Sequence, residues 1–116
     1  NKEINIANRI TAEQLEKHYN EDKLVLIDVR KRSEYNSEHL VDAINIPLNE
    51  INNHLAEFPK DKAFIVYCLG GYRSMIAASI LKQRGFDNFV DVIGGFNAIK
   101  TTNLPLTEYV CPSTLL

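Results

Sequence analysis

The sequence lacks the features that mark a membrane protein or a nucleic-acid-binding protein. It has no apolar run of roughly 18 residues, the length that a membrane-spanning helix needs. Its 13 basic residues are balanced by 15 acidic ones, and its longest basic block is Arg30-Lys31-Arg32. With 116 residues, of which 45% are hydrophobic, the chain is long enough to bury a core. We therefore expect one domain that neither crosses a membrane nor binds nucleic acid.

Cysteine and histidine are scarce. The two cysteines are Cys68 and Cys111, and the three histidines, His18, His39 and His54, do not have the spacing of metal ligands. We expect His18 and His54 on the surface and a structural hydrogen bond for His39. Cys111 lies in a polar, proline-flanked tail, and Cys68 must stay free if it is a nucleophile. The sequence thus predicts no metal site, no leader for export, and a reducing, cytoplasmic compartment.

Strand and helix patterns alternate along the chain. Strands are expected at about 3–7, 24–27, 43–46, 63–67 and 89–93, and helices at about 11–19, 33–37, 48–58, 75–84 and 96–100. Thr11 and Gln14 fit a capping box, Ser33 is a candidate cap, and Gly85 is expected to end the fourth helix. This alternation predicts an α/β fold with a roughly five-stranded, mainly parallel sheet and helices on both faces. We expect the core over about 4–101 and an extended tail over 102–116.

The run between the strand at 63–67 and the helix at 75–84 carries most of the chemical information. It consists of Cys68, Leu69, Gly70, Gly71, Tyr72, Arg73 and Ser74. Backbone N–H groups in such a turn converge with the positive end of the helix dipole, which favours a thiolate and binds an anion attached to it. The glycines let the backbone curl around the sulfur, and Arg73 adds a cation that favours the thiolate further.

Two interpretations of Cys68 have to be compared. A lone cysteine after a buried strand is most often a small, inert core residue. An inert core cysteine does not require two neighbouring glycines, an arginine and a serine at the start of the helix. The cluster therefore favours Cys68 as a nucleophile.

The pattern C-x-x-G-x-R-S after a buried strand resembles the active-site loop of the rhodanese-like sulfurtransferases. Other segments agree with this resemblance. Asp28-Val29-Arg30 followed by Glu34-Tyr35 resembles the family's D-V-R and E-Y segment, His39–Pro47 resembles its G-H-I-x-G-A-x-N-I-P segment, and Ile93-Gly94-Gly95 resembles its late G-G turn. The matches extend from about Thr11 to Ile99, which is nearly the whole chain.

Three positions depart from the family pattern. Glu38 and Asp42 stand where the family usually has glycines, and Ile99 stands where a tryptophan is common. All three lie outside the cysteine loop, so they concern the subfamily and the partner more than the chemistry. Asp28 and Arg30 are supporting residues, for which an ion pair or a capping role competes with a direct role.

The resemblance implies a single rhodanese-like domain over residues 1–116 that transfers sulfur without a cofactor. The Cys68 thiolate would take a sulfane sulfur from a persulfide or thiosulfate donor, and a thiol or cyanide would accept it. The N–H groups from Leu69 to Ser74 would stabilise the persulfide. Since Arg73 is the only cation of the loop, we expect weak activity with the thiosulfate dianion and better activity with a persulfide.

Two other functions remain open. Cysteine-dependent phosphatases have a similar loop, but five residues separate their cysteine and arginine, whereas four separate Cys68 and Arg73. The second alternative is a rhodanese-fold interaction or regulatory module without turnover.

The ends of the chain suggest a context. The sequence begins at Asn1 without a methionine, and Cys111-Pro112-Ser113 is similar to tails of rhodanese modules that are appended to larger sulfur-metabolism proteins. Metallo-β-lactamase-fold persulfide dioxygenases are one such group. We therefore expect a piece of a longer protein, in which a fused or partner sulfur-metabolism domain supplies or accepts the sulfur.

Overall fold

The computed structural model describes residues 9–19 and 25–108. Within them, five strands form one parallel sheet in the order β1-β5-β4-β2-β3. The strands are β1 (Arg9–Ile10), β2 (Val25–Asp28), β3 (Ile44–Asn45), β4 (Phe64–Tyr67) and β5 (Phe89–Val92). The helices are α1 (Ala12–His18), α2 (Arg32–Ser37), the 3-10 helices η2 (Leu48–Asn53) and η3 (Leu55–Glu57), α3 (Tyr72–Gln83) and α4 (Gly95–Ile99). The predicted α/β fold with a parallel sheet is confirmed.

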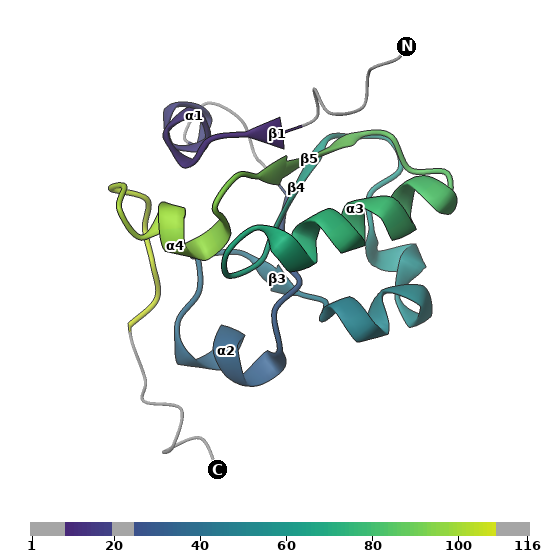
Figure 1. Ribbon diagram of the computed structural model, residues 1–116, viewed down its shortest axis with the longest axis horizontal. Coiled ribbons are helices and arrows are strands. Elements are labelled where there is room, and N and C mark those ends of the chain that lie inside the picture. Colours follow the sequence, from purple (N-terminus) through teal and green to yellow (C-terminus); the bar gives the residue numbers. More distant parts are fainter. Residues whose placement is uncertain (1–8, 20–24, 109–116) are drawn as a thin grey trace.

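Helices cover both faces of the sheet, as predicted. Helix α1 packs against α4, and α3 packs against the 3-10 helix η2; Figure 1 shows these helices around the strands. Side chains of β4 alternate between the two resulting cores: Phe64 and Val66 pack on the α3 side, and Ile65 and Tyr67 pack on the side of α1 and α4. All four residues of β4 are buried, which is typical of the central strand of a parallel sheet.

The predicted ends of two helices are confirmed. The Thr11 hydroxyl accepts a hydrogen bond from the Gln14 N–H at 3.1 Å, and the Gln14 side chain accepts one from the Thr11 N–H at 2.9 Å. This is the expected capping box of α1. At the end of α3, Gly85 adopts a φ of +92°, the left-handed conformation that stops a helix at little cost for glycine.

Two local predictions differ from the structure, and a third, the strand at 3–7, is not tested by it. The first described strand is Arg9–Ile10, while residues 3–7 lie outside the described residues. Lys31, not Ser33, caps α2, because its N–H donates to the Glu34 side chain at 3.0 Å. Residues 48–58 form two 3-10 helices that break at His54 instead of one α-helix. Three asparagines and the β-branched Ile51 in 49–53 favour helices weakly. Ile51 and Phe58 still reach the core.

The described part of the expected tail packs against the domain. Leu40 and Leu106 form an antiparallel bridge, and Leu104 is buried. The Thr107 N–H donates to the His39 carbonyl at 2.9 Å, and the Thr107 hydroxyl accepts from the His39 N–H at 3.0 Å. Cys111 lies outside the described residues.

The parallel arrangement brings the carboxyl ends of all five strands to one edge of the sheet. The segments after β2, β4 and β5 meet there, which is where open α/β sheets usually bind their ligands. In the described part of the chain, no helix is both long and apolar enough to span a membrane.

Candidate active site

Cys68 follows β4 directly and lies inside the turn that leads to α3. Its side chain is buried, and its Sγ accepts a hydrogen bond from the Gly71 N–H at 3.0 Å. The hydroxyl of Ser74, in the first turn of α3, lies 3.5 Å from the same Sγ and donates to the Gly71 carbonyl at 3.2 Å. The structure thus brings Cys68, Gly71 and Ser74 together at the amino end of a 12-residue helix. Such a helix end favours a negative charge on the sulfur.

Two glycines, Gly71 and Gly95, allow this turn to form. Gly71 has a φ of +96°, and a Cβ there would lie 3.1 Å from the Gly94 nitrogen. A Cβ at Gly95 would collide with the carbonyl oxygens of Cys68 and Leu69. Those carbonyls instead accept hydrogen bonds from two N–H groups in the first turn of α4, those of Phe96 and Asn97, at 2.6 and 2.9 Å. The late G-G turn therefore holds the cysteine loop in place, because the absence of a Cβ at Gly95 lets α4 bind the carbonyls of Cys68 and Leu69.

Arg73, the only cation of the cysteine loop, forms an ion pair with Glu34 that the sequence did not predict. Its guanidinium makes two hydrogen bonds to Glu34 of α2, at 2.8 and 3.1 Å. The bond to Glu34 raises the pKa of Arg73, and the same bond lowers the pKa of Glu34. Attraction to Cys68 contributes to the higher pKa of Arg73, so its charge still acts on the sulfur. Glu34 was not predicted as a site residue, although it lies in the E-Y segment that resembles the family.

Asp28 and Arg30 form a buried ion pair at the end of β2. The Arg30 Nη2 lies 2.8 Å from an Asp28 oxygen and donates to the Glu38 carbonyl, while the guanidinium lies 4.3 Å from the centre of the Phe96 ring. Burial disfavours the charge of Arg30, but the bonds to Asp28 outweigh it and raise the pKa. The pair thus connects β2 with the segments around α2 and α4. This arrangement fits the ion-pair interpretation.

The three residues that depart from the family pattern are compatible with the backbone conformation or the burial at their positions. Asp42 adopts a φ of +72°, a left-handed conformation that aspartate tolerates better than most residues. Glu38 is extended, with a φ of −170°, so a side chain is unstrained there. Ile99 is fully buried in the core beside α1 and α4. None of the three requires a change in the cysteine loop.

The histidines do not take part in the site. The His39 ring stacks on Tyr35 at 3.6 Å, and its Nδ1 lies 2.7 Å from the Tyr35 carbonyl, which is the structural bond that was expected. His18 is exposed, and His54 pairs with Glu50 and Glu57. Over residues 9–19 and 25–108, no group of three side chains could hold a metal ion.

The surface around the cysteine loop is largely apolar. Leu69, Tyr72, Met75 and Ile76 are all exposed, Tyr72 to 75%. A pocket of about 170 Å³ lies on the Leu69 side of the loop, and one of about 290 Å³ lies on the Arg73 side.

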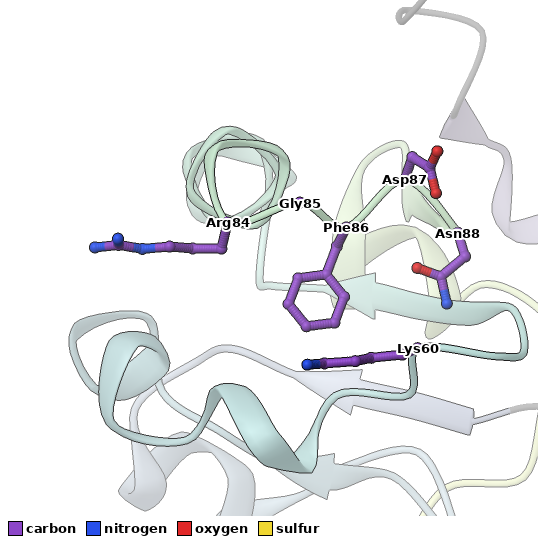
Figure 2. Close-up of a pocket in the computed structure, with 6 residues that line it drawn as sticks. All are labelled: Lys60, Arg84, Gly85, Phe86, Asp87 and Asn88. Atoms are coloured by element: carbon purple, nitrogen blue, oxygen red, sulfur yellow. The ribbon is translucent and has the colours of Figure 1, made fainter.

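A further pocket lies beyond the far end of α3. It has a volume of about 160 Å³ and is formed by Lys60 and residues 84–88. Figure 2 shows the Phe86 ring facing the side chain of Lys60 there. Asn88 uses its side-chain amide to bind the Pro59 and Lys62 carbonyls. This pocket contains no cysteine, so the cysteine loop is the candidate active site.

Comparison with known proteins agrees with this assignment. The family described as rhodanese-like domain matches residues 11–102. A protein named sulfurtransferase from Allochromatium vinosum is 29% identical over 102 residues, which cover 87% of this chain and 95% of that protein. A crystal structure of a rhodanese-related protein from Thermoplasma volcanium superposes with a TM-score of 0.77 at 30% identity, over 86% of this chain and 97% of that one.

A third relative is much longer. The adenylyltransferase and sulfurtransferase uba4 of Ogataea parapolymorpha is 42% identical over 71 residues, or 60% of this chain. The match covers 18% of that relative, so the chain corresponds to only one part of it.

Proposed function

This chain belongs to the rhodanese-like domain family, and from that premise we propose that it is a sulfurtransferase whose Cys68 carries the transferred sulfur as a persulfide. The names of its relatives support sulfur transfer in general. The observation that carries the persulfide proposal is the turn in which the Gly71 N–H and the amino end of α3 face the buried Sγ.

The first half-reaction loads the enzyme. The Cys68 thiolate attacks the outer sulfur of the donor, an S–S bond forms to Sγ, and the donor leaves with the electron pair of its broken S–S bond. The terminal sulfur of the persulfide then carries the negative charge. Backbone N–H groups at the start of α3 stabilise this charge, together with the helix dipole.

The second half-reaction unloads the enzyme. An acceptor thiolate or cyanide attacks the terminal sulfur, and the electron pair of the Cys68 S–S bond returns to Sγ as the thiolate. The cycle is closed without any redox partner, and no cofactor takes part in it. Cys68 has to remain a free thiol, which suits a reducing compartment such as the cytoplasm.

We propose a persulfide, not thiosulfate, as the preferred donor. The only cation in the loop, Arg73, is already paired with Glu34, so the site has little net positive charge to attract a dianion. The exposed Leu69 and Tyr72 suit the apolar parts of a thiol carrier or a protein. The combined name of the Ogataea relative supports a fused or partner sulfur-metabolism domain as the natural donor or acceptor.

Transfer to cyanide or a small thiol tests the enzymatic proposal against the non-catalytic alternative. Cys68→Ser changes one atom and leaves the loop backbone intact, so it should abolish transfer. Cys111→Ser is the matched control and should retain it. Transfer that persists in Cys68→Ser, or is absent from the wild type with every donor, would favour another nucleophile or an interaction module.

A further inference from the structure

The pocket of about 290 Å³ beside the cysteine loop has no role in the mechanism so far. It is formed by the segments that follow β2 and β3 and by the first turn of α3. Its lining consists of Val29, Lys31, Pro47, Leu48, Asn49 and Arg73. The volume is close to the lower end of the range for small-molecule sites, about 300 Å³. The crevice outside the carboxyl ends of parallel strands is also where open α/β sheets bind their ligands.

This pocket adjoins the surroundings of the sulfur. Val29 and Cys68 are buried in one apolar cluster, against which Leu48 packs. The Val29 N–H donates at 2.9 Å to the carbonyl of Tyr67, the residue that precedes Cys68. Arg73, which also lines the pocket, belongs to the cysteine loop. Since Cys68 itself does not line the pocket, the pocket suits the body of a donor whose reacting sulfur extends to the loop.

The lining combines apolar side chains with a cation. Val29, Pro47 and Leu48 supply apolar surface, and none of the described residues that line the pocket is acidic. The side chain of Lys31 is exposed, and none of the ion pairs found within residues 9–19 and 25–108 involves its ammonium group. This ammonium group can therefore bind an anionic group of a ligand in the pocket.

The acidic residues of the flanking segments do not cancel this charge. Glu34 binds Arg73, and Glu50 lies 3.7 Å from Arg32. The smaller pocket of about 170 Å³ on the other side of the loop is different, because Glu34 and Glu38 both line it. A carboxylate is repelled by such like charges, so it is accommodated better in the larger pocket.

We propose that this pocket binds the carrier portion of a persulfide donor that bears a carboxylate, and that Lys31 is the residue that determines this specificity. The Lys31 ammonium group binds the carboxylate, and the apolar lining contacts the rest of the carrier. Thiosulfate gains less from the pocket, because it has no apolar part. The inference rests on the proposed function in taking the ligand as the sulfur donor, and it names the chemical class of that donor.

Loading from two matched persulfides tests this specificity. The persulfides of N-acetylcysteine and of N-acetylcysteine amide are similar in size, and only the first bears a carboxylate. With Cys111→Ser as the parent chain, kcat/KM for the loading of Cys68 should be about threefold to fivefold higher with the acid, the effect of one exposed ion pair. Lys31→Gln should lower this ratio to about one through a higher KM for the acid, whereas Lys31→Arg should retain the ratio. Both variants keep the backbone N–H that caps α2.

Lys100→Gln is the matched control for the loss of charge. Lys100 is also an exposed lysine, but it lines the pocket on the other side of the loop. Its substitution removes the same charge and should leave the ratio of the acid to the amide unchanged. A parent chain that uses the two donors equally well would overturn the proposal. An equal fall of the ratio in Lys31→Gln and Lys100→Gln would overturn it as well, because the effect would then come from the overall charge.

Nuclear magnetic resonance gives a second test that needs no sulfur transfer. In Cys68→Ser, N-acetyl-S-methylcysteine cannot react, and it should shift the backbone N–H signals of Val29, Leu48 and Asn49. The corresponding amide should require an about threefold to fivefold higher concentration, and adding Lys31→Gln should remove this difference. If these shifts occur while neither persulfide loads Cys68, the binding site stands and the proposed sulfur transfer is wrong. If Cys68 is loaded but these signals do not shift, the inference is wrong and the proposed sulfur transfer stands.

Discussion

The sulfur of Cys68 contacts two polar groups, the Gly71 N–H at 3.0 Å and the Ser74 hydroxyl at 3.5 Å. Both belong to the four-residue turn or the first turn of the helix that follows it. A negative charge on a buried sulfur is costly unless such dipoles surround it. Since the Gly71 N–H is fixed by the backbone before the donor arrives, it can stabilise the persulfide without reorganising.

Gly71 is the residue on which this geometry depends most. Gly71→Ala places a Cβ on a backbone with a φ of +96° and brings it within 3.1 Å of the Gly94 nitrogen. We expect a loss of about 1–2 kcal/mol in the free energy of unfolding, measured in urea, and slower sulfur loading. Gly70→Ala is the matched control, because a Cβ there meets nothing within 4 Å. Equal stability of the two variants would contradict this account.

Glu34 partly neutralises the positive charge of Arg73 that a sulfur donor would encounter. Glu34→Gln removes the negative charge while retaining an oxygen that can accept from the guanidinium. The unbalanced cation should increase the rate of loading from thiosulfate by about threefold or more at low ionic strength. Loading from glutathione persulfide, which has less charge at the reacting sulfur, should change less. An unchanged ratio of the two rates would mean that Glu34 does not govern donor choice.

At the scale of the elements, the same ion pair joins α2 to α3 and makes their docking sensitive to acid. The Arg73 bond lowers the pKa of Glu34 below its ordinary value of 4.5. A carboxyl group with a lower pKa in the folded state stabilises the fold above its ordinary pKa, and this contribution is lost as the pH falls through the folded value. Thermal unfolding from pH 6 to pH 3 should therefore show a smaller loss of stability in Glu34→Gln than in the wild type. Parallel curves would show that the pair contributes nothing.

The buried pair of Asp28 and Arg30 holds the end of β2 against the segments that follow it. Asp28→Ala leaves the Arg30 guanidinium buried without its partner, so we expect a loss of about 3–5 kcal/mol in the free energy of unfolding. Adding Arg30→Met, which removes the unpaired charge, should recover part of that loss. The double-mutant cycle in urea measures this coupling. If the two losses were simply additive, the pair would not be the structural unit described here.

Local sequence patterns predicted those elements whose cause is local. The capping box of α1, the glycine stop of α3 and the turn at Cys68 all depend on residues within a few positions of each other. The prediction was wrong over 48–58, where apolar spacing suits a 3-10 helix about as well as an α-helix. It also missed the cap at Lys31, because a backbone N–H bound by Glu34 requires no capping side chain at that position.

At the scale of the whole molecule, alternation of strands and helices was enough to predict a parallel sheet with its site at the carboxyl edge. The pairings that complete the site could not be predicted in this way. Arg73 and Glu34 are 39 residues apart, and the pocket that Arg73 lines is formed by the separate segments after β2 and β3. Such contacts follow from the order of the strands, which periodicity does not specify. Glu34 was marked by the family resemblance alone, and nothing in the sequence marked Lys31 as a binding residue.

The most direct test of the central claim is the intact mass of the reduced protein before and after exposure to glutathione persulfide, with Cys68→Ser measured alongside. The account predicts that the wild type gains one sulfur atom, that a thiol acceptor removes it, and that Cys68→Ser gains none. Thiosulfate should load the wild type less completely under the same conditions. A wild type that gains no sulfur from either donor, or a Cys68→Ser variant that gains as much, would contradict the claim that Cys68 carries the sulfur.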